Sequence, residues 1–233
     1  MTQRTVVDGV PVQIAGEHSA KRAVIVIQEA FGVNDHIREV TDRFGAAGYF
    51  AVAPELFHRD GSPEIAYDDF KSAMAPMGNL AATNIESDIR ATLAYLASLG
   101  FQRENIGIVG YCMGGTVALA IDTLDLVGAA VTFYGGGVTT GRFGFAPLVE
   151  LATQLRAPWL GLYGDLDQGI PVEQVEQLRE AAARSSVASE IVRYGDAEHG
   201  FHCDQRPGSY NEVAAKDAAT RTYGFFDANL KGR

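Results

Sequence analysis

Short apolar runs and longer amphipathic segments alternate along the chain. The runs predict buried strands, since parallel strands covered on both faces carry few polar residues. They are residues 24–27, 49–53, 106–109, 127–134 and 158–163, and the more polar segment 190–194 is expected to be the last strand. The segments between them have apolar residues at helical spacing and predict helices. These are residues 35–47, 79–100, 114–121, 146–155, 171–184 and 210–230. The alternation predicts one α/β domain over residues 1–233, with a mostly parallel sheet covered by helices on both faces.

Two segments depart from this alternation. Near the N-terminus, residues 5–7 and 10–14 flank Asp8-Gly9, a pair that favours a β-hairpin. Residues 55–79 are rich in charge, glycine and proline, and predict a loop with a short helix from Pro63. Between these segments, Asp35 is the expected N-cap of the first long helix.

Composition and charge narrow the classes of function. The net charge of −10 argues against a nucleic-acid ligand, whose phosphates require a basic surface, and against an anionic membrane surface. The apolar run at residues 23–27 is too short to span a bilayer, and no apolar leader follows Met1. The two cysteines are expected to be free thiols in a reducing compartment. We therefore expect a cytoplasmic protein, either a monomer or a weak homodimer.

The most informative stretch follows the strand at residues 106–109. It reads Gly110-Tyr111-Cys112-Met113-Gly114-Gly115 and leads directly into a helix. A residue on so sharp a strand-to-helix turn adopts strained dihedrals, and its side chain projects above the sheet. A Cβ at Gly110 or Gly114 would collide with the neighbouring helix or strand. The stretch therefore predicts the nucleophile elbow of an α/β-hydrolase, with Cys112 in the place of the usual serine.

Two further strand ends carry reactive side chains. Asp167 follows the strand at 158–163 and His199 follows the strand at 190–194. Nucleophile, acid, then histidine is the chain order of α/β-hydrolases. His199 would move protons at the sulfur and at the leaving oxygen, and Asp167 would fix its tautomer. Asp165 is the alternative acid, although an aspartate there could instead bond to its own turn.

The same residues also have plainer interpretations. A buried cysteine is usually an inert small hydrophobe, and a lone histidine usually lies in a surface loop. The position of Cys112 between glycines, and of His199 after the last strand, favours the catalytic interpretation. A metal site of His199, His202 and Cys203 is weakly indicated, because no second ligand cluster accompanies it.

With these motifs the chain resembles the dienelactone hydrolase (carboxymethylenebutenolidase) family. The resemblance covers nearly the whole chain. Besides the elbow and the Asp167 loop, it rests on two further motifs, Gln-Glu-Ala-Phe-Gly-Val-Asn at residues 28–34 and His199-Gly200-Phe201. It implies an α/β-hydrolase fold and hydrolysis of a small ester or lactone, with no metal or organic cofactor. The family's Gly-x-Asp-x-x-Val/Ile-Pro spacing also favours Asp167 over Asp165.

The resemblance also implies roles for the residues around the nucleophile. Glu29 would lie beside Cys112 and help to form the thiolate when substrate binds. The backbone N–H groups of Ala30 and Met113 would form the oxyanion hole. The family's arginine four residues after the histidine is replaced here by Cys203. The remaining candidates for substrate binding are Arg59, Arg206, Tyr111 and Phe31.

Three hypotheses of function follow. The leading one is a cysteine-dependent ester or lactone hydrolase that forms a thioester acyl-enzyme on Cys112. The second is a protein that binds a ligand in the same pocket without turnover. The third is a thiol redox enzyme, which would need Cys203 to lie close enough to resolve an oxidised Cys112.

Overall fold

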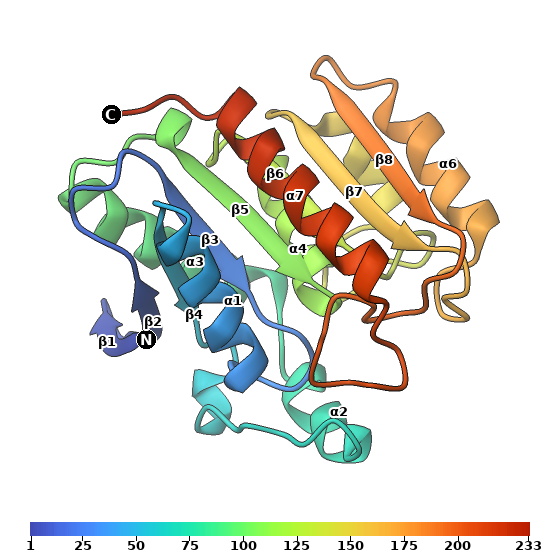
Figure 1. Cartoon of the computed structure of the whole chain (residues 1–233), viewed down its shortest axis with the longest axis horizontal. Coiled ribbons are helices and arrows are strands. Elements are labelled where there is room, and N and C mark those ends of the chain that lie inside the picture. The colour runs from blue at the N-terminus through green and yellow to red at the C-terminus, as the bar shows by residue number, and fades with distance from the viewer.

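The polypeptide builds a single eight-stranded sheet between two layers of helices (Figure 1). The computed structural model describes residues 1–233. The strand order is β1-β2-β4-β3-β5-β6-β7-β8, with β1 and β2 antiparallel to their neighbours and the other strands parallel. The strands are β1 (Gln3–Val7), β2 (Val10–Ala15), β3 (Ala23–Ile27), β4 (Phe50–Pro54), β5 (Ile106–Tyr111), β6 (Ala129–Phe133), β7 (Trp159–Gly164) and β8 (Ser189–Tyr194).

Seven α-helices accompany these strands. They are α1 (Asp35–Ala46), α2 (Phe70–Gly78), α3 (Ala82–Ser98), α4 (Met113–Asp122), α5 (Leu148–Leu151), α6 (Val172–Ala182) and α7 (Glu212–Asn229). Helices α1 and α7 lie over the face of the sheet turned to the viewer in Figure 1, and α3 and α4 lie behind it. The central strands are buried on both faces, which explains their continuous apolar sequences. The predicted α/β-hydrolase architecture is confirmed.

Three local expectations were wrong. The N-cap of α1 is Asn34, whose side chain accepts a hydrogen bond from the Ile37 amide, whereas Asp35 is already helical. The helix expected from Pro63 begins at Phe70, where Asp69 caps the first turn. The segment 146–155 is not one helix, because α5 ends at Leu151 and a 3₁₀ turn follows.

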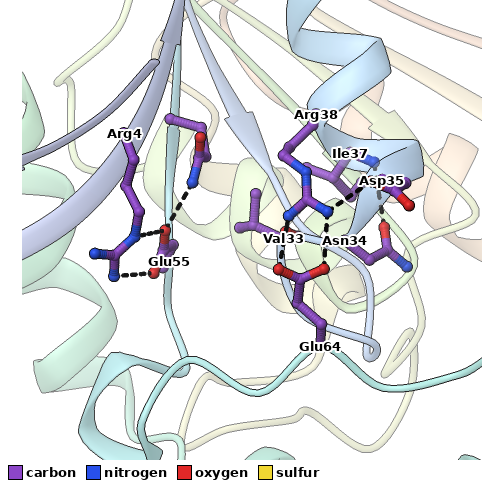
Figure 2. A network of polar contacts seen from close by, with 9 residues as sticks. Arg4, Val33, Asn34, Asp35, Ile37, Arg38, Glu55 and Glu64 are labelled. Carbon is purple, nitrogen blue, oxygen red and sulfur yellow. Dashed lines mark hydrogen bonds and ion pairs between the residues drawn. The ribbon is translucent and has the colours of Figure 1, made fainter. Parts of the chain in front are cut away.

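Two ion-pair networks fix the irregular segment after β4 (Figure 2). At its start, Arg4 forms two bonds of 2.8 and 2.9 Å with Glu55, which also accepts from Gln13. Further on, Glu64 receives two bonds of 2.8 Å from Arg38 of α1. The segment is therefore held against the sheet before it enters α2, and α2 lies beyond the carboxyl ends of the strands (Figure 1).

No helix combines the length and the apolar character that crossing a membrane would require.

Candidate active site

Cys112 lies on a strained turn between β5 and α4. Its backbone dihedrals are φ 56° and ψ −116°, in a region that residues with a side chain rarely occupy. The Cys112 amide donates to the carbonyl of Phe133 on β6 at 3.1 Å, and the Cys112 carbonyl accepts from the Gly115 amide at 3.0 Å. These bonds hold the strained residue in place, and its side chain remains partly exposed. The predicted elbow geometry is confirmed.

The two glycines beside Cys112 are needed for the close approach of α4 to the sheet. A Cβ on Gly110 would overlap the carbonyl group of Gly114 in α4. A Cβ on Gly114 would lie 2.5 Å from the carbonyl oxygen of Ile27 in β3. Both contacts are shorter than side-chain carbons tolerate, so the sequence of the elbow follows directly from its geometry.

His199 and Asp167 meet beyond the ends of β8 and β7. His199 Nδ1 lies 2.6 Å from Asp167 Oδ2. The other carboxylate oxygen accepts bonds from the amides of Gly169 (2.8 Å) and Ile170 (3.2 Å). Asp167 is buried, so the backbone of its own loop fixes the orientation of the carboxylate. The carboxylate in turn fixes the imidazole ring.

Asp165, the alternative acid, is engaged elsewhere. Both of its oxygens accept from the guanidinium of Arg193, each at 2.7 Å. Asp165 therefore stabilises the edge of the sheet at β8 and does not contact His199.

The imidazole of His199 carries a proton readily. Burial by itself would lower its pKa, but the adjacent Cys112 side chain and the hydrogen-bonded Asp167 outweigh burial and raise the pKa to about 10. The ring therefore keeps its proton at neutral pH, where it can act as a general acid.

Cys112 and His199 line a pocket of about 570 Å³. Phe70 of α2 lines it, which places the segment after β4 at the rim of the site. Two arginines, Arg142 and Arg206, also line the pocket. Neither guanidinium belongs to an ion pair. The pocket therefore combines the predicted triad with two unpaired positive charges.

Of the four expected substrate-binding residues, the structure brings only Arg206 to this pocket. Its guanidinium lies over the rings of Phe31 (5.7 Å to the centroid) and Tyr67 (5.4 Å). Phe31 is 4% exposed and supports Arg206 from below the surface of the site. Tyr111 is buried and stacks on Phe133, with ring centroids 4.6 Å apart, so it belongs to the core.

Arg59 does not lie where the expected role in substrate binding would require. Its guanidinium forms two bonds of 2.7 and 2.8 Å with Asp88, a carboxylate buried in α3. The pair satisfies a buried charge, and Arg59 does not line the pocket. Arg142 takes the second cationic position. It comes from the loop after β6, where it packs against Gly136 and Gly137. A glycine run before an arginine was the only sequence signal for it.

Glu29 is buried next to the elbow but makes no hydrogen bond to Cys112. Its oxygens accept from the hydroxyls of Tyr67 (3.1 Å) and Tyr134 (3.4 Å). The next residue is Ala30, whose amide has no backbone acceptor. The Met113 amide lies in the first turn of α4, where amides have no intrahelical partner. Both N–H groups are therefore available to a ligand.

The structure does not gather His199, His202 and Cys203 into one metal site. His202 is buried against the rings of Tyr111 and Phe133, at centroid distances of 5.1 and 5.0 Å. Burial lowers the pKa of His202 to about 3. Burial and then the charge of Glu29 raise the pKa of Cys203 to about 12, and both cysteines are free. A neutral, fully buried thiol is a poor redox partner for Cys112.

Comparison with known proteins gives consistent matches. The sequence model of the dienelactone hydrolase family matches residues 10–230. A Salmonella typhimurium protein provisionally named carboxymethylenebutenolidase is 40% identical over 210 residues, covering 87% of this chain and 76% of the relative. The carboxymethylenebutenolidase of a Pseudomonas species is 30% identical over 204 residues, covering 85% and 81%. A crystal structure of a provisionally named dienelactone hydrolase from Klebsiella pneumoniae superposes with a TM-score of 0.85 at 32% identity, covering 97% of this chain and 98% of the other.

Proposed function

The chain belongs to the dienelactone hydrolase family, and on this premise we propose that it hydrolyses its substrate through a thioester on Cys112. The family membership makes the protein an ester or lactone hydrolase. The observation that supports the covalent mechanism is that three side chains line a single pocket. These are Cys112, His199 and Asp167, and His199 is hydrogen-bonded to Asp167. A non-catalytic binding protein has no need of a strained cysteine beside an aligned imidazole.

The proposed reaction has two halves. The Cys112 sulfur attacks the carbonyl carbon, and the Ala30 and Met113 amides stabilise the oxyanion that forms. The tetrahedral intermediate collapses, the carbon–oxygen bond breaks, and His199 gives its proton to the leaving oxygen. Water then attacks the thioester while His199 accepts a proton from it. The carboxylic acid departs, and the sulfur and the imidazolium are restored.

The test of the mechanism is to trap the acyl group. We expect mass spectrometry of protein quenched during turnover of an aryl ester or an unsaturated lactone to show an adduct on the peptide that carries Cys112. The adduct should be cleaved by hydroxylamine and absent in Cys112→Ala, and the Cys203→Ala variant should still form it. Full activity in Cys112→Ala would contradict the mechanism. Stoichiometric acylation without turnover would support the binding protein instead.

We further propose that the pocket prefers substrates with a free carboxylate, which Arg206 and Arg142 would bind. A hydrogen-bonded charge pair contributes about 1.5–3 kcal/mol, or roughly 10- to 150-fold in affinity. Arg206→Gln should therefore raise KM by that factor for an ester that carries a carboxylate, and leave KM unchanged for its neutral methyl ester. Arg90→Gln is the control, since Arg90 is exposed on α3 and lies outside the pocket. Equal effects on both substrates would argue against carboxylate binding.

A further inference from the structure

Three buried side chains of metal-binding type converge behind the reaction centre. Glu29 follows β3, His36 lies in the first turn of α1, and Cys203 lies in the loop between β8 and α7. One ligand atom from each lies within 4.8 Å of the other two. All three side chains are fully buried. We propose that Glu29, His36 and Cys203 form a binding site for a thiophilic divalent cation of the zinc class.

His36 gives the independent reason to expect a ligand there. The ring is 0% exposed, and neither nitrogen makes a hydrogen bond of normal geometry; Nδ1 has only the Asp204 carboxylate at 3.4 Å, and Nε2 has no polar partner. Buried polar groups are normally hydrogen-bonded, because an unpaired one loses its bonds to water and gains nothing. The other two members are satisfied, since the Tyr67 hydroxyl interacts with both Glu29 and Cys203. The unpartnered group in the cluster is thus the imidazole, a good zinc ligand.

The surroundings of His36 fit a metal-bound imidazole. Its Nδ1 lies 3.4 Å from Oδ1 of Asp204, whereas its Nε2 has no polar partner. Zinc-bound histidines commonly direct their second nitrogen to a carboxylate, which fixes the ring and strengthens the ligand. Asp204 also pairs with Arg43 at 2.6 Å and is half-exposed.

Charge and size are both suitable for zinc. A thiolate, a carboxylate and a neutral imidazole balance the two charges of Zn²⁺, and all three are common zinc ligands. Zinc bonds of about 2.0–2.3 Å require ligand atoms separated by about 3.3–3.8 Å in a tetrahedron. The present separations, all within 4.8 Å, need only small side-chain rotations to reach this range. Water or the Tyr67 hydroxyl would fill the fourth position.

The cluster is separate from the substrate pocket. Cys112 and His199 line that pocket, whereas none of the three ligands does. The protein therefore presents two thiols to a metal, and the experiment must distinguish Cys203 from Cys112.

The test is a titration of the full-length, chelator-treated protein with Co²⁺, followed by displacement with Zn²⁺. We expect one equivalent to bind, with the thiolate-to-cobalt charge-transfer absorption of a single cysteine ligand. Cys203→Ser should abolish this absorption, and His36→Gln should weaken binding more than about 100-fold. Cys112→Ser and His202→Gln should keep it. His202 is the matched control, because it is a second buried histidine whose ring lies 5.7 Å from that of His36.

X-ray absorption of zinc-loaded Cys112→Ser gives a second measurement that needs no change in the cluster. One sulfur at about 2.3 Å and nitrogen or oxygen ligands at about 2.0–2.1 Å support the proposal. A cobalt absorption that survives in Cys203→Ser and disappears in Cys112→Ser would overturn it, since the metal would then sit at the reaction centre. Absence of saturable binding to the wild-type protein would overturn it as well.

Discussion

The substitution Asp167→Asn tests how the histidine is held, because the structure determines how an amide must lie at this position. Oδ1 of Asp167 receives two backbone amides, from Gly169 and Ile170. An asparagine keeps both bonds only if its oxygen takes that place, which turns its NH₂ group toward Nδ1 of His199. Nδ1 must then accept a hydrogen bond, and the ring proton moves to Nε2. The nitrogen that should accept a proton from water, when water attacks the thioester, is thereby blocked.

The expected loss follows from this tautomer argument. The corresponding change in a Ser-His-Asp triad lowers kcat by about 10⁴. A thiol is more acidic than a hydroxyl and depends less on a base, so we expect a loss on the order of 10²–10³, or about 3–4 kcal/mol of transition-state stabilisation. The bond to Asp167 also helps to raise the pKa of His199 to about 10. The alkaline limb of kcat/KM should therefore move toward neutral pH in the variant.

The stability of Asp167→Asn provides a second check with a defined sign. A pKa that is raised in the folded state stabilises the fold below the ordinary value near 6.5, and this contribution is lost as the pH rises toward 10. The variant should therefore be less stable than the wild type at pH 6, and the difference should shrink above pH 10. Urea denaturation at both pH values measures it.

Asp165→Asn is the matched control, since it makes the same chemical change two residues away. It weakens the ion pair with Arg193, which is partly exposed, so we expect kcat within about twofold of wild type and a stability loss of at most about 1 kcal/mol. The reasoning is refuted if Asp165→Asn is the more damaging variant for kcat, or if Asp167→Asn retains more than a tenth of the wild-type kcat.

Three further predictions concern stability and are measured by chemical denaturation. Asn34→Ala should lower the free energy of unfolding by about 1 kcal/mol, because it removes the N-cap of α1. Asp35→Ala should lower it by less than about 0.5 kcal/mol, and equal losses would contradict the assigned cap. Gly114→Ala should lower the free energy of unfolding by about 1–3 kcal/mol, because the new Cβ would collide with β3. Gly224→Ala has no atom near the new Cβ and should raise the free energy of unfolding by about 0.5–1 kcal/mol. The reverse order would contradict the packing argument. Burial raises the pKa of Asp122 from 3.8 to about 7, so the free energy of unfolding of the wild type should fall as the pH rises from 4 to 7. Asp122→Asn should lose this dependence, and parallel pH profiles of the two proteins would contradict the argument.

The sequence predicted the architecture well where one physical requirement dominated. The strands at 24–27 and 106–109 are apolar because both faces of the sheet are covered, so their burial could be predicted. The elbow was recognisable because Gly110 and Gly114 are required by contacts only a few residues away or on the adjacent strand. The start of α2 was less predictable, because Asp69 competes with Pro63 as a start signal and local sequence does not decide between them.

Residues that depend on distant contacts could not be placed from the sequence. Arg59 lies in a short 3₁₀ turn and Arg142 in a loop, and only Arg59 meets a buried carboxylate, that of Asp88 in α3. His36 gave no sequence signal, since a histidine in the first turn of an amphipathic helix is ordinary. Glu29, His36 and Cys203 come from three separate segments, and only the fold shows the cluster.

Glu29 connects the two proposals, because one carboxylate cannot serve both at once. Its oxygens are held by the hydroxyls of Tyr67 and Tyr134 in the structure, and one of them lies within 4.8 Å of the ligand atoms of His36 and Cys203. To help form the Cys112 thiolate, the carboxylate must leave these partners and act as a base, as the family resemblance implies. A bound divalent cation would occupy that carboxylate and hold it away from Cys112. Metal binding and Glu29-assisted activation therefore exclude each other, and zinc bound at this cluster should reduce turnover without competing with substrate for the pocket.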